Sequence, residues 1–266
     1  MDLDRYLARI GYDGPLAVDV PTLEAVVESH ALGVAYENLD VYLEDPVTTS
    51  VDEALAKIVD RGRGGWCYEM NGTLGWALEQ IGFHVTRMVG AANEADGGPD
   101  QRGNHLVLRI DLDEPWIADV GLGGSLVRPF PVAEGSIEQG WRSFRVERMG
   151  EGHWRLHNRP GALPASFDWI DQPADEDHLS AYCRRLHDDA ESLFRQNLIV
   201  IHSTPETSSM LLGKVVIDTR DGSQETLDSE EQLLDVITGR FGLSLPDETS
   251  TLWDRVEARH VELFGS

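Results

Sequence analysis

The chain of 266 residues is long enough for one large domain or for two to three small ones. Its formal net charge of −25 disfavours nonspecific binding to nucleic acid, because a polyanion would be repelled along most of the surface. No apolar run approaches the roughly 18 residues of a membrane span, and the acidic start from Met1 to Arg5 lacks the features of a signal peptide. Two cysteines make no disulfide framework. We therefore expect a cytoplasmic protein whose partners are neither nucleic acid nor membrane.

The first 84 residues predict helices. An apolar stripe at helical spacing ends at Gly11, and Pro21 opens a second helix in which His30 lies on the apolar side. We expect His30 to be a core residue and not a ligand. Ser50 and Glu53 have the spacing of a capping box, which predicts a further helix after them.

A glycine-rich loop at residues 61–65 leads through Trp66 to Cys67, where the next helix is predicted to begin. Its apolar residues keep helical spacing as far as Ile81, and Gly82 stands where a C-terminal cap belongs. The amides of a first helical turn are unpaired and carry partial positive charge, which favours a thiolate over a thiol. Taken alone, Cys67 fits a buried structural cysteine as well as it fits a nucleophile.

From about residue 85 to 170 the pattern changes to short alternating runs. These predict strands at 86–91, 104–110, 116–120, 143–147 and 153–156, which can close into a small barrel. Residues 93–100 read as a polar loop. His153 and His157 lack a third ligand nearby, so we expect no metal site.

The two strands around residue 112 form the most informative hairpin. If the hairpin folds symmetrically about Leu112, His105 lies directly opposite Asp119 on the same face. A carboxylate beside an imidazole fixes the orientation of the ring and stabilises its charged form. Cys67, His105 and Asp119 would then supply the nucleophile, the base and the orienting group that covalent acyl chemistry requires.

The C-terminal third reads as a small α/β unit. A charge-dense helix over 171–195 carries Cys183, which lacks a glycine loop and is expected to be structural. Strands are predicted at 198–201 and 211–218. Asp228 with Glu231 is predicted to cap a helix, and a last helix should run over about 250–263.

Four blocks of this chain together resemble the arylamine N-acetyltransferase family, and their order and spacing agree with it from Asp4 to about Ala258. The blocks are Tyr36-Glu37-Asn38-Leu39, Arg63-Gly64-Gly65-Trp66-Cys67-Tyr68-Glu69, His105 on a strand, and Asp119-Val120-Gly121-Leu122-Gly123-Gly124. Two positions depart from the family: Tyr36 stands where phenylalanine is frequent, and Leu122 stands where many members carry an aromatic residue.

The resemblance implies an α+β fold with a cysteine-protease-like catalytic core. It implies an N-terminal helical bundle over 1–84, a central β-barrel-like domain over 85–194 and a C-terminal α/β lid over 195–266. It further implies acetyl-CoA as co-substrate and no metal. The acetyl group would pass through Cys67, served by His105 and Asp119, to an arylamine, arylhydrazine or arylhydroxylamine.

The same resemblance implies roles for further residues. Coenzyme A contacts are expected from Gly121, Gly123, Ser208 and Ser209, and the acceptor pocket from Tyr36, Trp66 and Leu122. Glu37 and Arg63 are expected to form a structural ion pair beneath the nucleophile loop.

Three alternative functions compete with acetyl transfer as interpretations of these residues. A transglutaminase-like thiol hydrolase would present cysteine, histidine and aspartate in this order, and an amide synthase that forms macrolactams resembles this family. A binding domain with a vestigial site is disfavoured, because all three triad positions are filled.

Overall fold

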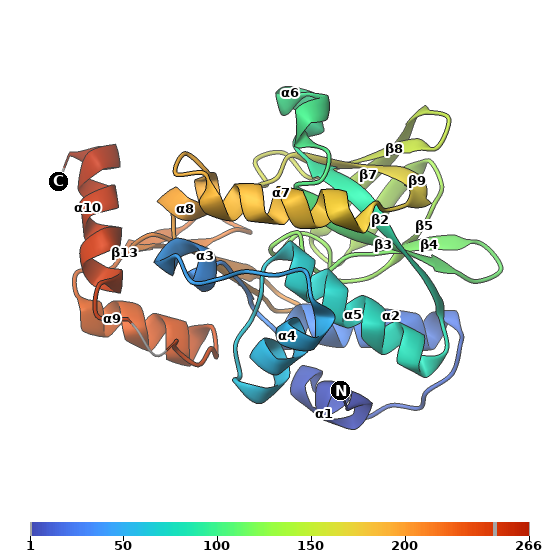
Figure 1. Cartoon of the computed structure of the whole chain (residues 1–266), viewed down its shortest axis with the longest axis horizontal. Coiled ribbons are helices and arrows are strands. Elements are labelled where there is room, and N and C mark those ends of the chain that lie inside the picture. Colours follow the sequence, from blue (N-terminus) through green and yellow to red (C-terminus); the bar gives the residue numbers. More distant parts are fainter. Residues whose placement is uncertain (1, 247–248, 266) are drawn as a thin grey trace.

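The computed structural model describes residues 2–246 and 249–265 and combines helices with two antiparallel sheets (Figure 1). One sheet has eight strands in the order β5-β4-β3-β2-β9-β8-β7-β6, and the other has five in the order β1-β10-β11-β12-β13. The α+β class predicted from the sequence is confirmed. None of the helices in the described ranges is long and apolar enough to span a membrane.

The N-terminal helices follow the predicted pattern. They are α1 (Leu3–Ile10), α2 (Val20–Gly33), α3 (Leu39–Leu43), α4 (Val51–Leu55), the π-helix η1 (Ala56–Asp60) and α5 (Cys67–Ile81). Gly11 caps α1 in the left-handed conformation, and His30 is fully buried with a 2.7 Å hydrogen bond to Tyr6, as a core histidine should be. The predicted capping box was wrong: Ser50 precedes α4, but its side chain makes no capping hydrogen bond.

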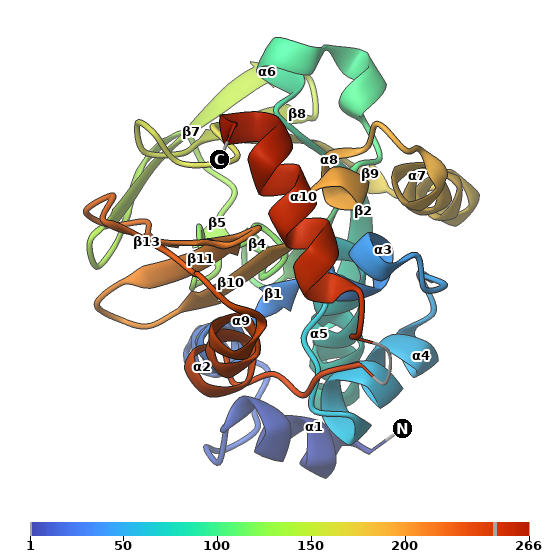
Figure 2. The same ribbon diagram turned by 90° about the vertical axis from the view of Figure 1, so that its left-hand side faces the viewer.

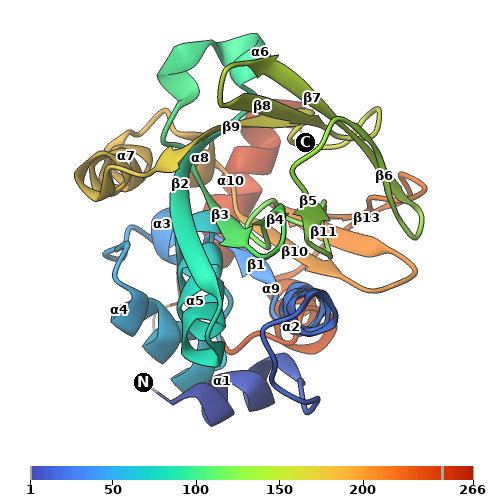
Figure 3. The same cartoon turned by 90° about the vertical axis from the view of Figure 1, so that its right-hand side faces the viewer.

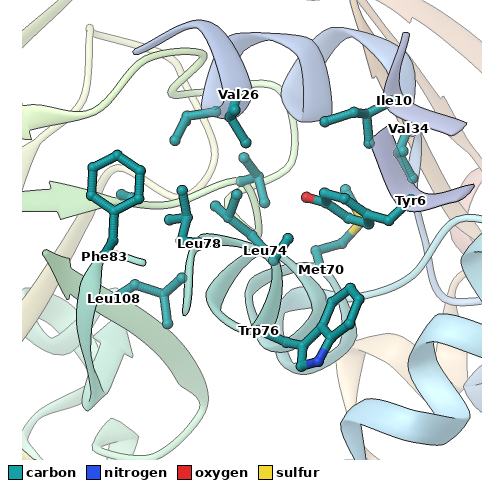
Figure 4. Packing of buried hydrophobic residues seen from close by; sticks show 14 of the residues in the cluster. Tyr6, Ile10, Val26, Val34, Met70, Leu74, Trp76, Leu78, Phe83 and Leu108 are labelled. Atoms are coloured by element: carbon teal, nitrogen blue, oxygen red, sulfur yellow. The ribbon is translucent and has the colours of Figure 1, made fainter. Parts of the chain in front are cut away.

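Helix α5 fixes the position of Cys67. It is buried along most of its length, and Leu74 and Leu78 lie among apolar side chains of α1, α2 and the neighbouring strands (Figure 4). Gly82 ends the helix at φ 115°, which confirms the predicted cap. A helix held on several sides cannot slide or rotate without opening the core, so the residue at its start is held rigidly.

The eight-stranded sheet curls into an incompletely closed barrel (Figure 3). Its strands are β2 (His84–Ala92), β3 (His105–Asp111), β4 (Pro115–Ala118), β5 (Phe130–Pro131), β6 (Gly135–Gln139), β7 (Arg142–Gly150), β8 (His153–His157) and β9 (Ser166–Pro173). The barrel-like expectation is confirmed. The polar loop predicted at 93–100 was wrong in part, because it holds the short helices α6 (Glu94–Gly97) and η2 (Pro99–Gln101).

The C-terminal third adds helices and the smaller sheet (Figure 2). Its helices are α7 (Glu176–Asp188), α8 (Leu193–Gln196), α9 (Glu230–Asp235), the π-helix η3 (Val236–Arg240) and α10 (Leu252–Phe264). Its strands are β10 (Ile199–Ser203), β11 (Ser208–Leu212), β12 (Val215–Asp218) and β13 (Gln224–Thr226).

Three predictions for this region needed correction. The single strand predicted at 211–218 is a hairpin, because Gly213 takes φ 59° and reverses the chain between β11 and β12. The single helix predicted over 171–195 begins only at Glu176, since residues 171–173 continue β9, and it is broken between α7 and α8. The cap of α9 is Ser229, whose side chain accepts from the backbone N–H of Gln232, and not Asp228.

Strand β1 (Tyr36–Glu37) pairs with β10, a strand from the C-terminal third of the chain. Tyr36 pairs with Ile201 and Glu37 with Val200, and Tyr36 also bridges to Gly65 in the nucleophile loop. The division into three domains at residues 84 and 194 remains a proposal. If that division holds, the first domain supplies the edge strand of the third domain's sheet.

Candidate active site

The nucleophile loop is shaped by its glycines. A Cβ at Gly64 would lie 2.0 Å from the carbonyl oxygen of Ala35, so only glycine fits where the loop passes β1. Glu69 then accepts a hydrogen bond of 3.2 Å from the backbone N–H of Trp66, which anchors the start of α5. Cys67 is the first residue of that helix and is 3% exposed.

Cys67, His105 and Asp119 meet at this point. The imidazole Nε2 of His105 lies 2.6 Å from Oδ2 of Asp119, and the side chain of Cys67 is near enough to the same ring to raise its pKa. The Sγ atom of Cys67 lies 3.7 Å from the carbonyl oxygen of Asn104, the residue before His105. The arrangement places a thiol, an imidazole and a carboxylate in contact in that order, as nucleophilic acyl transfer requires.

The hairpin register predicted for His105 and Asp119 was wrong by two residues. Leu108 pairs with Ala118 and Arg109 with Ile117, so the turn is centred on Asp113 and β4 ends before Asp119. A shift of two keeps side chains on the same face of the sheet. The two groups therefore still meet, although they lie diagonally and not directly opposite.

Asn71, one helical turn after Cys67, holds Asp119 in place. Its Nδ2 donates to Oδ1 of Asp119 at 2.8 Å and to the carbonyl of Leu106 at 2.6 Å, and its Oδ1 accepts from the N–H of Val120 at 2.9 Å. With Oδ1 of Asp119 occupied, Oδ2 remains for His105. Sequence reasoning missed Asn71, although its position four residues after Cys67 places it on the same helix face.

The electrostatics of the site favour a charged imidazole. Burial disfavours the imidazolium, but the charge and hydrogen bond of Asp119, together with Cys67, outweigh it and raise the pKa of His105 to about 10. The charged ring lies beside Cys67, where it can donate a proton to a leaving group.

A buried ion network supports the nucleophile loop from below. The predicted pair is confirmed: the guanidinium of Arg63 lies 2.8 Å from Oε1 of Glu37. Lys57 adds contacts to Asp40 at 2.8 Å and to Glu69 at 2.9 Å, and these residues are buried or nearly so. Sequence reasoning missed Lys57, although a lysine on an apolar helix face in a chain with few lysines was a usable signal.

The predicted coenzyme A residues do not all share one face. Gly121 packs so tightly on Cys67 that a Cβ would lie 2.7 Å from its Cα atom, and Gly123 takes φ 49°. Ser208 is buried beside Gly124, where a Cβ would meet its hydroxyl. Ser209 follows Ser208 in β11, so it points to the opposite face, and its hydroxyl accepts from Arg240 at 2.9 Å.

The three predicted acceptor residues also differ in their surroundings. Tyr36 and Trp66 share an apolar cluster with Cys67, and Trp66 packs edge-on against Tyr68 and Phe194. Leu122 instead packs into the core of the barrel. Of the three, Tyr36 is the most exposed, at 8%, whereas the buried indole Nε1 of Trp66 has no hydrogen-bond partner among the described residues.

Within the described residues, one group of side chains has the spacing of a metal site. Glu94, His153 and Asp168 bring their ligand atoms within 4.8 Å of one another. Arg102 binds both oxygens of Glu94, and Arg155 binds both oxygens of Asp168. Because two guanidinium groups already neutralise the carboxylates, the group is explained as an ion network of the barrel.

A cavity missed by sequence reasoning opens beside Gly123 and Gly124. It lies between the loop after Asp119, the start of β7 and the β11–β12 hairpin, and Arg142 and Arg159 line it.

Comparison with known proteins decides the family. A family model described as N-acetyltransferase matches residues 19–250. The arylamine N-acetyltransferase of Mycolicibacterium smegmatis is 36% identical over an alignment that covers 100% of this chain and 99% of the relative. The chain belongs to the arylamine N-acetyltransferase family.

Further relatives and solved structures agree with this membership. The arylamine N-acetyltransferase of Escherichia coli (strain K12) is 27% identical over 92% of this chain and 90% of its own length. The structure of M. smegmatis arylamine N-acetyl transferase superposes with a TM-score of 0.85 at 33% identity, covering 96% of this chain and 97% of that one. The structure of Mycobacterium marinum arylamine N-acetyltransferase in complex with CoA superposes with a TM-score of 0.83 at 25% identity, covering 97% of this chain and 98% of that one. The family is one of acyltransferases, and the cysteine-protease-like core implied by the sequence is confirmed. Neither the hydrolase nor the amide synthase alternative is favoured.

Proposed function

We propose that this protein transfers acetyl from acetyl-CoA to an arylamine, arylhydrazine or arylhydroxylamine through an acetyl-Cys67 intermediate. The observation that carries the proposal is the contact of His105 with both Cys67 and Asp119, in a chain of this family. We also propose a cytoplasmic location, which the two unpaired cysteines support.

In the first half-reaction the thiolate of Cys67 attacks the thioester carbonyl of acetyl-CoA. The carbon–sulfur bond to coenzyme A breaks, and the imidazolium of His105 gives its proton to the leaving thiolate. Asp119 steadies the ring throughout, and Asn71 holds Asp119. The products are acetyl-Cys67 and coenzyme A.

In the second half-reaction the amine nitrogen attacks the acetyl carbonyl of acetyl-Cys67. His105, now neutral, accepts the amine proton, the sulfur of Cys67 leaves as a thiolate, and the amide is released. The site returns to its starting state with no net oxidation or reduction. Tyr36 is proposed to contact the acceptor, while Trp66 and Leu122 shape the pocket through packing.

For coenzyme A we propose a path along the loop after Asp119. The absence of a Cβ at Gly121 and Gly123 lets an extended chain approach the backbone, and Ser208 borders the same space. The opposite orientation of Ser209 makes it an indirect contributor through Arg240.

Steady-state kinetics test the proposal. Without an acceptor, acetyl-CoA should release only about one equivalent of coenzyme A per enzyme, and continued release should require an arylamine. Double-reciprocal plots with both substrates varied should give parallel lines, because acetyl passes through the enzyme. Continued release of coenzyme A over many turnovers without an acceptor would support the hydrolase alternative, and intersecting lines would contradict the covalent intermediate.

A further inference from the structure

The cavity beside Gly123 and Gly124 is lined by two arginines, although the protein is strongly acidic. It is lined by backbone of the loop after Asp119 and by side chains from three later segments, among them Gly124, Arg142, Asn158, Arg159 and Thr219. The protein carries 47 acidic residues against 22 basic ones. Two arginines that line one cavity in such a chain call for an explanation.

Neither arginine has an acidic partner within ion-pair distance among the described residues. Arg142 is 2% exposed, and it donates to the main-chain carbonyls of Gly124, Thr204 and Thr207 at 3.2–3.4 Å. Arg159 donates to the carbonyl of Thr219. Buried guanidinium groups are ordinarily paired with carboxylates, because an unpaired charge is expensive to bury.

The two guanidinium groups also pack on the same aromatic ring. Both lie over the ring of Trp141, with Cζ at 4.4 Å from the ring centre for Arg142 and 4.9 Å for Arg159. Burial and the neighbouring charge of Arg159 lower the pKa of Arg142 to about 10. The like charges therefore repel, and a bound anion would relieve that repulsion.

One carboxylate lines the same cavity, but it is engaged elsewhere. Asp218 accepts from the hydroxyl of Thr207 at 2.7 Å and from the backbone N–H of Arg220 at 2.8 Å. It stabilises the β11–β12 hairpin and leaves the arginines without a counter-ion.

The cavity lies within reach of the nucleophile. Gly121 packs directly on Cys67, and Gly124, three residues later, accepts from Nε of Arg142. Three peptide units span at most about 11 Å. The long pantetheine arm that separates the thioester of acetyl-CoA from its phosphates can bridge such a gap.

We propose that Arg142 and Arg159 form a phosphate-binding site that holds the diphosphate or the phosphomonoester of the acyl donor. The inference rests on the proposed acetyl transfer and narrows the donor to phosphorylated thioesters. Arginine suits this role because its planar fork of N–H groups binds phosphate oxygens in pairs.

The test compares two donors in matched variants. Arg159→Gln is measured with acetyl-CoA and with S-acetylpantetheine, which carries no phosphate. The control is Arg145→Gln, an exposed arginine on β7 that pairs with Glu147 outside the cavity. We expect Arg159→Gln to raise KM for acetyl-CoA about tenfold or more, which corresponds to the loss of one charge-assisted hydrogen bond. The KM for S-acetylpantetheine should stay within about twofold of the parent value. Arg159→Lys should recover part of the loss.

Inorganic pyrophosphate supplies an independent readout. It should compete with acetyl-CoA in the parent enzyme and in Arg145→Gln, and it should lose this inhibition in Arg159→Gln. Equal losses for both donors, or an unchanged KM for acetyl-CoA, would overturn the phosphate site. A parent enzyme that accepts acetyl from neither donor would instead refute the proposed function.

Discussion

The substitution Asp119→Asn tests the catalytic geometry with a minimal change in volume. In the structure, Oδ1 of Asp119 accepts from Asn71 and from the N–H of Gly121 at 2.8 Å each, while Oδ2 faces His105 at 2.6 Å. An asparagine can keep both contacts to Oδ1. Its Nδ2 then faces His105 as a donor, so the imidazole must accept at that nitrogen and carry its proton on the side facing Cys67.

That tautomer cannot take the thiol proton, and the charge that stabilises the imidazolium is gone. The equivalent change in a serine triad lowers the rate by about 10⁴, or about 5 kcal/mol in the barrier. We expect a similar loss in single-turnover acetylation of Cys67 by acetyl-CoA alone. The melting temperature should fall by only a few degrees, because two of the three contacts of Asp119 persist and a neutral amide is less costly to bury.

Asp113→Asn is the matched control, since this carboxylate lies exposed in the turn of the same hairpin. It should be acetylated at the parent rate. The reasoning is refuted if Asp119→Asn is also acetylated at the parent rate while it remains folded.

Three further predictions concern ionisation and buried charge. Iodoacetamide should label Cys67 well before Cys183. Burial, with a smaller effect of Glu69, raises the pKa of Cys183 to about 12, whereas Cys67 lies beside a charged imidazole. Peptide mapping that finds Cys183 labelled first would contradict this prediction. The pKa of His105 is about 10 in the fold against about 6.5 in an unfolded chain, so its protonation stabilises the protein fully below about pH 6.5 and this stabilisation is lost towards pH 10. The melting-temperature gap between the parent and His105→Gln should accordingly narrow from pH 7 to pH 10, and a widening gap would be inconsistent with it. Lys57→Met should reduce the free energy of unfolding by about 3–5 kcal/mol in urea titrations, because it leaves buried carboxylates uncompensated. The control is Lys214→Met, whose partner Glu257 lies 4.0 Å away at the surface, and it should change the free energy of unfolding by less than about 1 kcal/mol.

Local sequence signals were sufficient for the elements that carry the catalytic groups. Helix α5 was predictable because its apolar spacing, the glycine loop before Cys67 and the cap at Gly82 all lie within one segment. The strand ending near Asp119 was predictable from alternation. The register was not, because the centre of the turn depends on how the hairpin packs and not on the composition of residues 111–115.

Features that join distant segments left no local signature. The pairing of β1 with β10 and the cavity of Arg142 and Arg159 depend on contacts between parts of the chain far apart in sequence. The opposite orientation of Ser208 and Ser209 follows from their place in β11, which begins before the strand predicted at 211–218. Such features require the fold before they can be seen.

Mass spectrometry of the protein mixed with acetyl-CoA, without any acceptor, tests the central claim most directly. The triad predicts one stable acetyl group on the peptide that contains Cys67, and its prompt loss when an arylamine is added. An unmodified Cys67, or an acetyl group on another residue that an arylamine removes equally well, would contradict acyl transfer through this cysteine.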